Sequence, residues 1–142
     1  MKVIFLDIDG VLNAHYNTKE RWHGLIGIDP KHVKLFNQLV EQVGAKVVLS
    51  STWRRRDNWK EIMHEHGLDE SIFIGRTDYL GDIRGKEIKK YLDTHPEIKQ
   101  YAIIDDDSDM LPDQHLFKTR WNVGLTERIC EDIVAHFKSE NY

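Results

Sequence analysis

Short apolar runs alternate along the chain with longer amphipathic stretches. The apolar runs have the length and composition of buried strands. They cover residues 3–8, 46–50, 72–74, 101–104 and 116–118. In the intervening stretches, apolar side chains recur every three or four residues, which predicts helices. These helices are expected from Asp29–Pro30 to Gly44, from Asp57 to Gly67, from about Gly85 to Leu92, and from Thr126 to Phe137.

Strands that alternate with helices predict an α/β fold, in which a mostly parallel sheet is covered on both faces. The chain has 142 residues, which suits a single domain spanning residues 1–142. In sheets of this kind, ligands bind beyond the carboxyl ends of the strands. Polar residues that directly follow the predicted strands are therefore the first candidates for chemistry.

Two aspartates, Asp7 and Asp9, end the first strand and lead into a turn at Gly10. A carboxylate can attack a phosphorus atom when a divalent cation offsets the negative charge of the phosphate. A second carboxylate nearby can then protonate the leaving oxygen and later activate water. The alternative to a catalytic role is a purely structural one, because aspartate is common where strands end.

Three later segments carry groups that suit the same chemistry. Hydroxyl side chains follow the second strand at residues 50–52, where they can hold phosphate oxygens or simply cap a helix. Lys86 lies near the start of a predicted helix and can neutralise a phosphoryl group, although most lysines are only solvated. Residues 105–107 are three consecutive aspartates, which repel one another unless a cation lies among them.

This order of motifs, D-x-D, then Ser, then Lys, then Asp-Asp, spans residues 3 to about 110 and resembles the haloacid dehalogenase (HAD) superfamily of phosphohydrolases. The resemblance implies a Rossmann-like three-layer sandwich, a Mg²⁺ cofactor and an aspartyl-phosphate intermediate. It also implies the roles of individual residues. The expected catalytic set is Asp7 as nucleophile, Asp9 as general acid and base, Ser50 as phosphate-binding hydroxyl and Lys86 as stabilising cation.

The expected metal ligands are the Asp7 carboxylate, the main-chain carbonyl of Asp9, and Asp106 with Asp105 beside it. Asp109 is a candidate partner behind these ligands. Ser51 remains an alternative to Ser50. The resemblance also implies what the aspartate at position 9 means. Dehalogenases of the superfamily lack a second carboxylate at this position, and transport ATPases carry a threonine there. Asp9 therefore favours a phosphatase or, less often, a phosphomutase. A catalytically silent binding module on the same fold is the alternative from another class.

The expected substrate follows from the absence of a long insertion. Residues 11–28 provide only a small flap, so we expect no large cap domain. The site is then expected to be open, which suits a macromolecular phosphate end, or to be closed by a partner subunit. The runs F-L-D-I-D-G-V-L-N and V-L-S-S-T-W-R-R resemble the phosphatase-type domains of RNA-repair proteins and, less closely, of phage polynucleotide kinase-phosphatases. A nucleotide or polynucleotide end is the expected substrate, with a small metabolite or a phosphoprotein as the alternative.

Further residues are candidates for holding such a substrate. The expected substrate-binding residues are Ser51, Thr52, Arg54 and Arg55, with Trp53 or Trp59 stacking a base. The alternative is that the arginines form a solvated face and Trp59 belongs to the core. The flap offers its own polar and aromatic side chains, which are His15, Tyr16, Arg21, Trp22 and His23.

Composition limits the partners and the compartment. The net charge of −4 argues against a protein that coats nucleic acid by bulk charge. No apolar run approaches the roughly 20 residues of a membrane span, so no membrane partner is expected. Cys130 is the one cysteine, which excludes an internal disulfide, and its apolar helical surroundings predict a core position. A reducing, cytoplasmic setting fits these features, whereas the oligomeric state stays open.

Overall fold

The computed structural model describes residues 1–14, 21–22 and 25–139, with only the backbone at residues 21–22 and 25–26. A five-stranded sheet forms its centre, in the order β5-β4-β1-β6-β7. All neighbouring strands of this sheet run parallel. The strands are β1 (Lys2–Leu6), β4 (Lys46–Leu49), β5 (Phe73–Arg76), β6 (Gln100–Asp105) and β7 (Leu116–Lys118).

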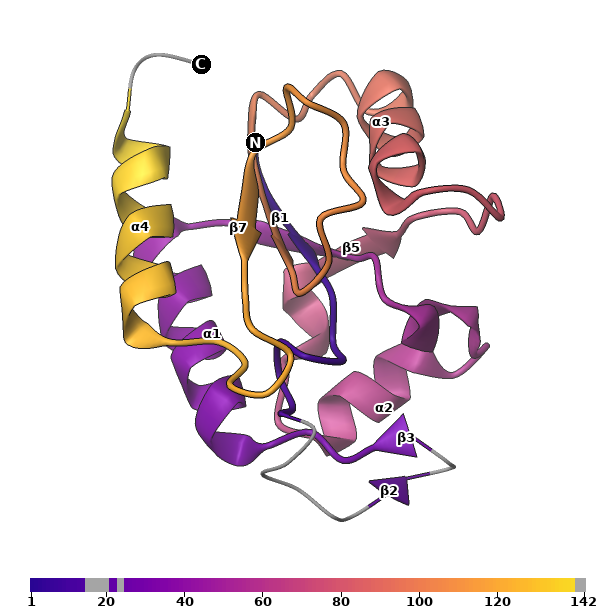
Figure 1. Ribbon diagram of the computed structural model, residues 1–142, viewed down its shortest axis with the longest axis vertical. Coiled ribbons are helices and arrows are strands. Elements are labelled where there is room, and N and C mark those ends of the chain that lie inside the picture. The colour runs from indigo at the N-terminus through magenta and orange to yellow at the C-terminus, as the bar shows by residue number, and fades with distance from the viewer. Residues whose placement is uncertain (15–20, 23–24, 140–142) are drawn as a thin grey trace.

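Helices cover both faces of the sheet, and α1 and α4 lie side by side (Figure 1). The α-helices are α1 (Pro30–Val43), α2 (Trp59–Glu65), α3 (Arg84–Thr94) and α4 (Glu127–Lys138), and the short 3₁₀ helices are η1 (Thr52–Arg55) and η2 (Glu70–Ile72). The predicted Rossmann-like α/β fold is therefore confirmed. None of the described helices has the length and apolar character needed to cross a membrane.

The ends of the helices follow from local sequence. The Asp29 side chain accepts a hydrogen bond from the backbone N–H of Lys31, and Pro30 begins α1. Gly44 ends α1 with φ of 69°, a left-handed conformation that glycine adopts without steric cost. Thr126 caps α4 in the same manner as Asp29 caps α1, through the N–H of Ile129. The predicted starts of α1 and α4 are thus correct.

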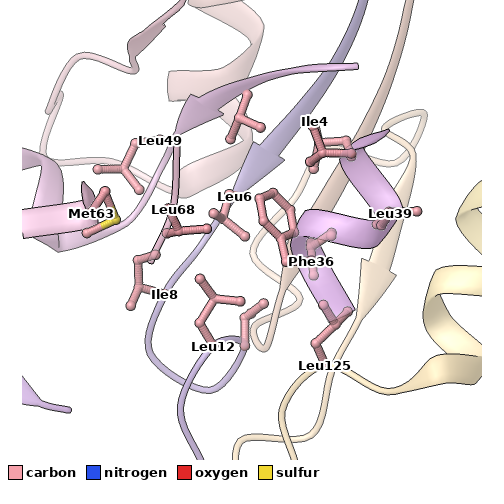
Figure 2. Close-up of a cluster of buried hydrophobic side chains, with 14 of the residues drawn as sticks. Ile4, Leu6, Ile8, Leu12, Phe36, Leu39, Leu49, Met63, Leu68 and Leu125 are labelled. Carbon is pink, nitrogen blue, oxygen red and sulfur yellow. The ribbon is translucent and has the colours of Figure 1, made fainter. Parts of the chain in front are cut away.

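Two apolar clusters hold the layers together. The larger cluster joins one face of β1 and β4 to α1, α2 and α4, and Figure 2 shows Phe36 and Leu39 of α1 near Ile4 and Leu6 of β1. The smaller cluster joins the opposite face of the sheet to α3, through Ile88 and Tyr91. Burial of apolar surface at about 25 cal/mol per Å² is the main stabilising contribution in such layers. Among the described elements, α1, α2 and α4 therefore lie on one face of the sheet and α3 on the other.

The segment between β1 and α1 carries no large cap in its described part. Its backbone forms two short antiparallel strands, β2 (Arg21–Trp22) and β3 (Leu25–Ile26). The side chains predicted to form the flap, His15, Tyr16, Arg21, Trp22 and His23, lie outside the described residues. The predicted strand at residues 72–74 is displaced, because β5 begins at Phe73 after the 3₁₀ turn η2.

Candidate active site

The carboxyl ends of β1, β4 and β6 meet at one edge of the sheet. The backbone N–H of Asp7 donates to the carbonyl of Ile104 at 3.0 Å, and that of Ser50 donates to Leu6 at 2.9 Å. These bonds extend the strand ladders by one residue and bring the polar ends of three strands side by side. The predicted convergence of polar residues at this edge is therefore present in the fold.

The alternation of side chains along a strand decides which face each polar residue takes. Phe5, Val48 and Ile103 belong to the smaller cluster, on the face covered by α3. Two residues further along, each of these strands presents a polar side chain to that same face. These side chains are Asp7, Ser50 and Asp105. They converge where α3 begins.

An acidic cluster occupies this position. Carboxylate oxygens of Asp7, Asp105 and Asp106 all lie within 4.8 Å of one another. Asp7 and Asp105 are buried, whereas Asp106 is partly exposed. The three residues come from the ends of β1 and β6, so this proximity depends on the pairing of those two strands. The three carboxylates that the sequence predicts as metal ligands are therefore brought together.

Burial and mutual repulsion disfavour the charged forms of two of these carboxyls. Burial, followed by repulsion from Asp105, raises the pKa of Asp7 well above its usual range. Burial raises the pKa of Asp105 to about 7, although the N–H of Asp107 opposes the shift by donating to this carboxylate at 3.0 Å. Such crowding of carboxylates is relieved when a cation is present.

Among the described residues, Arg84 brings a positive charge to the cluster. Its Nη1 lies 3.6 Å from Oδ1 of Asp7 and 3.5 Å from Oδ2 of Asp105, and it donates a hydrogen bond to the carbonyl of Ser50. Its Nε lies 3.4 Å from Glu87, so the guanidinium is oriented from two sides. One positive charge does not balance three carboxylates, so a second cation is electrostatically favoured here.

The chemistry of the cluster fits a divalent metal ion. Carboxylate oxygens are the ligands that Mg²⁺ prefers in proteins. The Oδ2 atom of Asp105 is buried and accepts no hydrogen bond from the described residues, which leaves a lone pair for a metal.

Gly10 has φ of 82°, and a methyl group on it would collide with the Asp106 carboxylate. Glycine is therefore required for Asp106 to approach the turn.

Asp9 is oriented by two side chains. Its Oδ1 accepts hydrogen bonds from Nδ2 of Asn13 at 2.9 Å and from Nε1 of Trp53 at 3.2 Å. Asn13 in turn accepts from the N–H of Gly10 at 2.9 Å, so it ties the whole D-x-D-G turn together.

The prediction that Trp53 stacks a base is wrong, because this indole is fully buried and supports Asp9. Trp59 also belongs to the core, where it packs edge-on against Phe73.

The structure distinguishes the two serines that follow β4. Ser51 Oγ accepts from the backbone N–H of Trp53 at 3.3 Å and caps η1. Ser50 Oγ is buried and has no hydrogen-bond partner among the described residues, on the face shared with Asp7. An unsatisfied buried hydroxyl is unfavourable unless a ligand completes it. This arrangement favours Ser50 over Ser51 as a phosphate-binding hydroxyl, while Thr52 is exposed at the start of η1.

Arg54 does not have the solvent-facing position expected of a phosphate ligand. Its side chain is 2% exposed and its Nη2 lies 2.7 Å from Oε1 of Glu87. Its other N–H groups donate to the carbonyls of Ser50, Ser51 and Thr77. Burial lowers the pKa of Arg54, and Glu87 opposes that shift. The prediction for Arg54 is corrected: this arginine fixes the loop that presents Ser50.

Arg55 is exposed, so its predicted role in substrate binding stays a prediction. Its guanidinium carbon lies 4.2 Å from the centre of the Tyr79 ring, and that ring is itself exposed. Cations stack in this way on the face of an aromatic ring. Arg55 and Tyr79 together line a small cavity at the carboxyl end of β5, with Arg76 beside them.

Lys86 also lies away from the acidic cluster. Its Nζ pairs with Asp82 at 3.3 Å, and 56% of its side chain is exposed. The structure therefore corrects the sequence prediction, since Arg84 is the cation that reaches Asp7. Helical periodicity contained the signal: Arg84 precedes Ile88 by four residues and Tyr91 by seven, so these three residues share the inner face of α3.

Asp109 fixes the start of α3. Its Oδ2 accepts a hydrogen bond from the backbone N–H of Arg84 at 3.1 Å, and its carbonyl accepts one from the backbone N–H of Gly85 at 3.0 Å. The carboxylate thus satisfies an N–H group that a helix leaves unpaired at its first residue. Asp109 therefore supports the position of Arg84, and its predicted place behind the metal ligands stays a prediction.

Comparison with known proteins agrees with this arrangement. Residues 3–130 match the family described as the HAD domain in Swiss Army Knife RNA repair proteins. The matched region contains β1, the acidic cluster and Arg84, as well as the turn after β7. A search of curated proteins finds no significant match.

Proposed function

Because the chain belongs to the family of HAD domains found in Swiss Army Knife RNA repair proteins, we propose that it is a Mg²⁺-dependent phosphomonoester hydrolase acting on a nucleotide or a polynucleotide end. One observation carries the proposal. The Asp7 carboxylate lies in a buried acidic cluster and faces the guanidinium of Arg84 across 3.6 Å. The proposed nucleophile and the proposed metal ligands thereby lie next to a cation.

Asp7 is the proposed nucleophile. A carboxylate oxygen of Asp7 forms a bond to phosphorus while the bond from phosphorus to the leaving alkoxide breaks, which gives an aspartyl-phosphate. Asp7, Asp105, Asp106 and the Asp9 carbonyl would hold Mg²⁺, which would supply positive charge against the phosphate dianion. Arg84 adds a second positive charge next to Asp7, where negative charge accumulates on the transferring group.

Asp9 is the proposed proton carrier. It donates a proton to the leaving oxygen, and its carboxylate then removes a proton from the water that attacks phosphorus. That second attack releases inorganic phosphate and restores Asp7. The hydrogen bonds from Trp53 and Asn13 hold Asp9 in one orientation for both steps. The buried hydroxyl of Ser50 is the proposed donor to a phosphate oxygen.

The proposed substrate class is supported by the family and by the surface near the site. The described part of the chain carries no large cap, so a macromolecular end can approach the acidic cluster. The exposed pair of Arg55 and Tyr79 offers a cation and a ring to a nucleic-acid strand. The proposed compartment is the cytoplasm, where the single thiol of Cys130 would stay reduced.

Two alternatives are separated by one experiment. A small-metabolite or phosphoprotein phosphatase would use the same chemistry, whereas a silent binding module would use none of it. Hydrolysis of an aryl phosphate with Mg²⁺ by the wild type, and its loss in Asp7→Asn, would support a phosphatase of either kind over the silent module. The matched control is Asp93→Asn, since Asp93 is an exposed partner of Lys89 on α3. Absence of wild-type activity with every divalent metal tried would favour the silent module.

A further inference from the structure

The carboxyl end of β5 continues the row of polar residues at the active-site edge of the sheet. The register of β1 and β4 places Ser50 beside Asp7, and the register of β4 and β5 places Thr77 beside Ser50. The backbone N–H of Thr77 donates to the carbonyl of Leu49 at 3.0 Å, which extends this last pairing by one residue. Since neighbouring strands lie about 5 Å apart, Thr77 is roughly 10 Å from Asp7 along the edge.

The hydroxyl of Thr77 shares two properties with that of Ser50. Thr77 is 2% exposed, and its Oγ1 has no hydrogen-bond partner in the part of the chain that the structure describes. Gly75, two residues earlier, faces α3, because a methyl group on it would lie 2.8 Å from the Tyr91 hydroxyl. Side chains alternate along a strand, so Thr77 takes that same face, on which Asp7 also lies. Two buried hydroxyls that can donate to phosphate oxygens therefore follow Asp7 in succession.

Thr77 also lines a cavity of about 290 Å³ at the end of β5. The other lining residues are Arg54, Arg55, Arg76, Asp78 and Tyr79. We call this space the arginine cavity. The net charge of the chain is −4, so three guanidinium groups around one cavity are a local concentration of positive charge.

Two of these guanidinium groups carry uncompensated charge. The ion pairs that arginines form within the described residues include neither Arg55 nor Arg76. Nη1 of Arg76 donates to the backbone carbonyls of Arg54 at 2.6 Å and of Arg56 at 3.3 Å. Arg55 stacks on the Tyr79 ring, which orients its side chain without neutralising it. Guanidinium groups in this state suit the oxygens of a phosphate.

The acidic groups near the cavity are engaged elsewhere. Asp78 lines the cavity, but its carboxylate pairs with Lys90 at 2.8 Å. Glu87 pairs with the buried Arg54 at 2.7 Å and neutralises that third guanidinium. The surplus positive charge of the arginine cavity therefore remains for a ligand.

Buried contacts fix the arginine cavity relative to the acidic cluster. Nε of Arg54 donates to the carbonyl of Thr77 at 3.1 Å, and its Nη2 lies 2.7 Å from Glu87. Glu87 also lies 3.4 Å from Nε of Arg84, whose Nη1 faces Asp7 across 3.6 Å. A ligand held at both places would therefore meet two groups at a set separation.

From this arrangement we propose that the arginine cavity binds a second phosphate, the phosphodiester next to the terminal phosphate that lies at Asp7. Arg55 and Arg76 contact its oxygens, and the Thr77 hydroxyl donates to one of them. A polynucleotide end supplies this second phosphate, whereas a nucleoside monophosphate or a sugar phosphate has none. The inference rests on the proposed function and makes it more specific, because it assigns a polynucleotide end rather than a mononucleotide as the preferred substrate.

The test compares substrates that differ by one phosphodiester. A dinucleotide with a terminal phosphate, at its 3′ or its 5′ end, is paired with the mononucleotide that carries the same terminal phosphate. The wild type should have the higher kcat/KM on the dinucleotide, and added salt should reduce this preference. In Arg55→Gln, the ratio of kcat/KM for the dinucleotide to that for the mononucleotide should fall about tenfold, mainly through KM.

Three further variants sharpen the comparison. Thr77→Val removes the hydroxyl at nearly constant shape and should also lower the ratio. Arg55→Lys should retain part of the ratio, because it keeps the charge but loses the planar fork of donors. Arg128→Gln is the matched control and should keep the wild-type ratio, since Arg128 is exposed and pairs with Asp132 within α4.

The outcomes separate the two proposals. If the wild type hydrolyses both substrates without preferring the dinucleotide, or if Arg55→Gln leaves the ratio unchanged, this inference is overturned while the proposed function stands. If Arg55→Gln weakens activity only on an acidic phosphopeptide, the arginine cavity serves a protein substrate, and the inference is equally overturned.

If the wild type hydrolyses no phosphate ester, the proposed function fails, and binding decides about the arginine cavity. The probe is a fluorescent oligonucleotide with a 3′- or 5′-terminal phosphate. Weaker binding by Arg55→Gln than by Arg128→Gln supports the cavity, and equal binding overturns it.

Discussion

Arg84 extends from the first residue of α3 to the end of β1, where its Nη1 lies 3.6 Å from Oδ1 of Asp7. The proposed chemistry needs a positive charge at this position, and Lys86 points elsewhere. We expect Arg84→Gln to lower kcat on an aryl phosphate by about 100-fold or more, as losing one preorganised donor commonly does. Steady-state kinetics with saturating Mg²⁺ would measure this.

Lys86→Gln is the matched control for that experiment. Lys86 and Arg84 both lie in the first turn of α3, but the exposed ion pair of Lys86 with Asp82 should contribute little to catalysis. The kcat of Lys86→Gln should stay within about twofold of the wild-type value, because the charge that the substitution removes is well solvated. A larger loss in Lys86→Gln than in Arg84→Gln would contradict the assignment of Arg84 as the stabilising cation.

The pair of Arg54 and Glu87 is expected to contribute to stability. Both side chains are almost fully buried at 2% and 3% exposure, and Glu87 also accepts from the backbone N–H of Leu80 at 2.8 Å. Glu87→Gln would leave the guanidinium of Arg54 without its counter-ion, which typically costs about 3–5 kcal/mol. Urea unfolding would measure the loss. Asp93→Asn, which breaks an exposed pair on the same helix, should have little effect, and equal losses would refute this role.

Stability without metal should fall as the pH rises toward neutrality. The folded protein holds the pKa of Asp105 at about 7, whereas an unfolded aspartate titrates near ~3.9. Between these two values the folded state keeps a proton that the unfolded state has lost, so the free energy of unfolding decreases with increasing pH. The contribution is complete below the unfolded pKa and is lost as the pH passes through the folded pKa. The raised pKa of Asp7 acts in the same direction.

Urea unfolding in EDTA at about pH 5 and at about pH 8 would reveal this dependence. Asp105→Asn should flatten it, because the substitution removes one titrating group and the repulsion that it exerts on Asp7. Mg²⁺ should stabilise the wild type more at the higher pH, since a metal binds ionised carboxylates. A Mg²⁺ effect that is equal at both pH values would show that the acidic cluster does not hold the ion.

Cys130 should be a slow nucleophile in the folded protein. Burial, together with the nearby Glu127 and Glu131, raises the pKa of its thiol to about 11. At neutral pH this lowers the fraction of reactive thiolate about 100-fold relative to a free cysteine. Labelling with a thiol reagent should be slow in buffer and fast in urea. Rapid labelling of the folded chain would contradict the packed position of Cys130 beside the larger cluster.

The proximity of Asp7 and Asp105 is predictable from the sequence, because a geometric rule links these distant positions. The carboxyl ends of parallel strands meet at one edge, so placing Asp7 and Asp105 on strands was sufficient to predict their proximity. Caps such as Asp29 and Thr126 are local features, and they were equally readable. The same reasoning established the fold class, because alternating strands and helices have few compact arrangements.

The position of the stabilising cation is not predictable in the same way, because it depends on the direction of one side chain. Arg84 and Lys86 are two residues apart, so they point about 200° apart around a helix. The burial of Trp53 and Arg54 could not be read at all, because η1 is too short to show a periodicity. Their partners, Asp9 and Glu87, lie far away in sequence and are found only in the folded chain.

The most direct test is to look for phosphoryl on Asp7 itself. Asp9→Asn should slow the hydrolysis of the aspartyl-phosphate, because the water then lacks its base. This variant, mixed with an aryl phosphate and Mg²⁺ and quenched in acid, should yield an N-terminal peptide whose mass is higher by one phosphoryl group, localised to Asp7 by fragmentation. An unmodified Asp7 under these conditions, together with phosphate release by Asp7→Asn at the wild-type rate, would contradict the account.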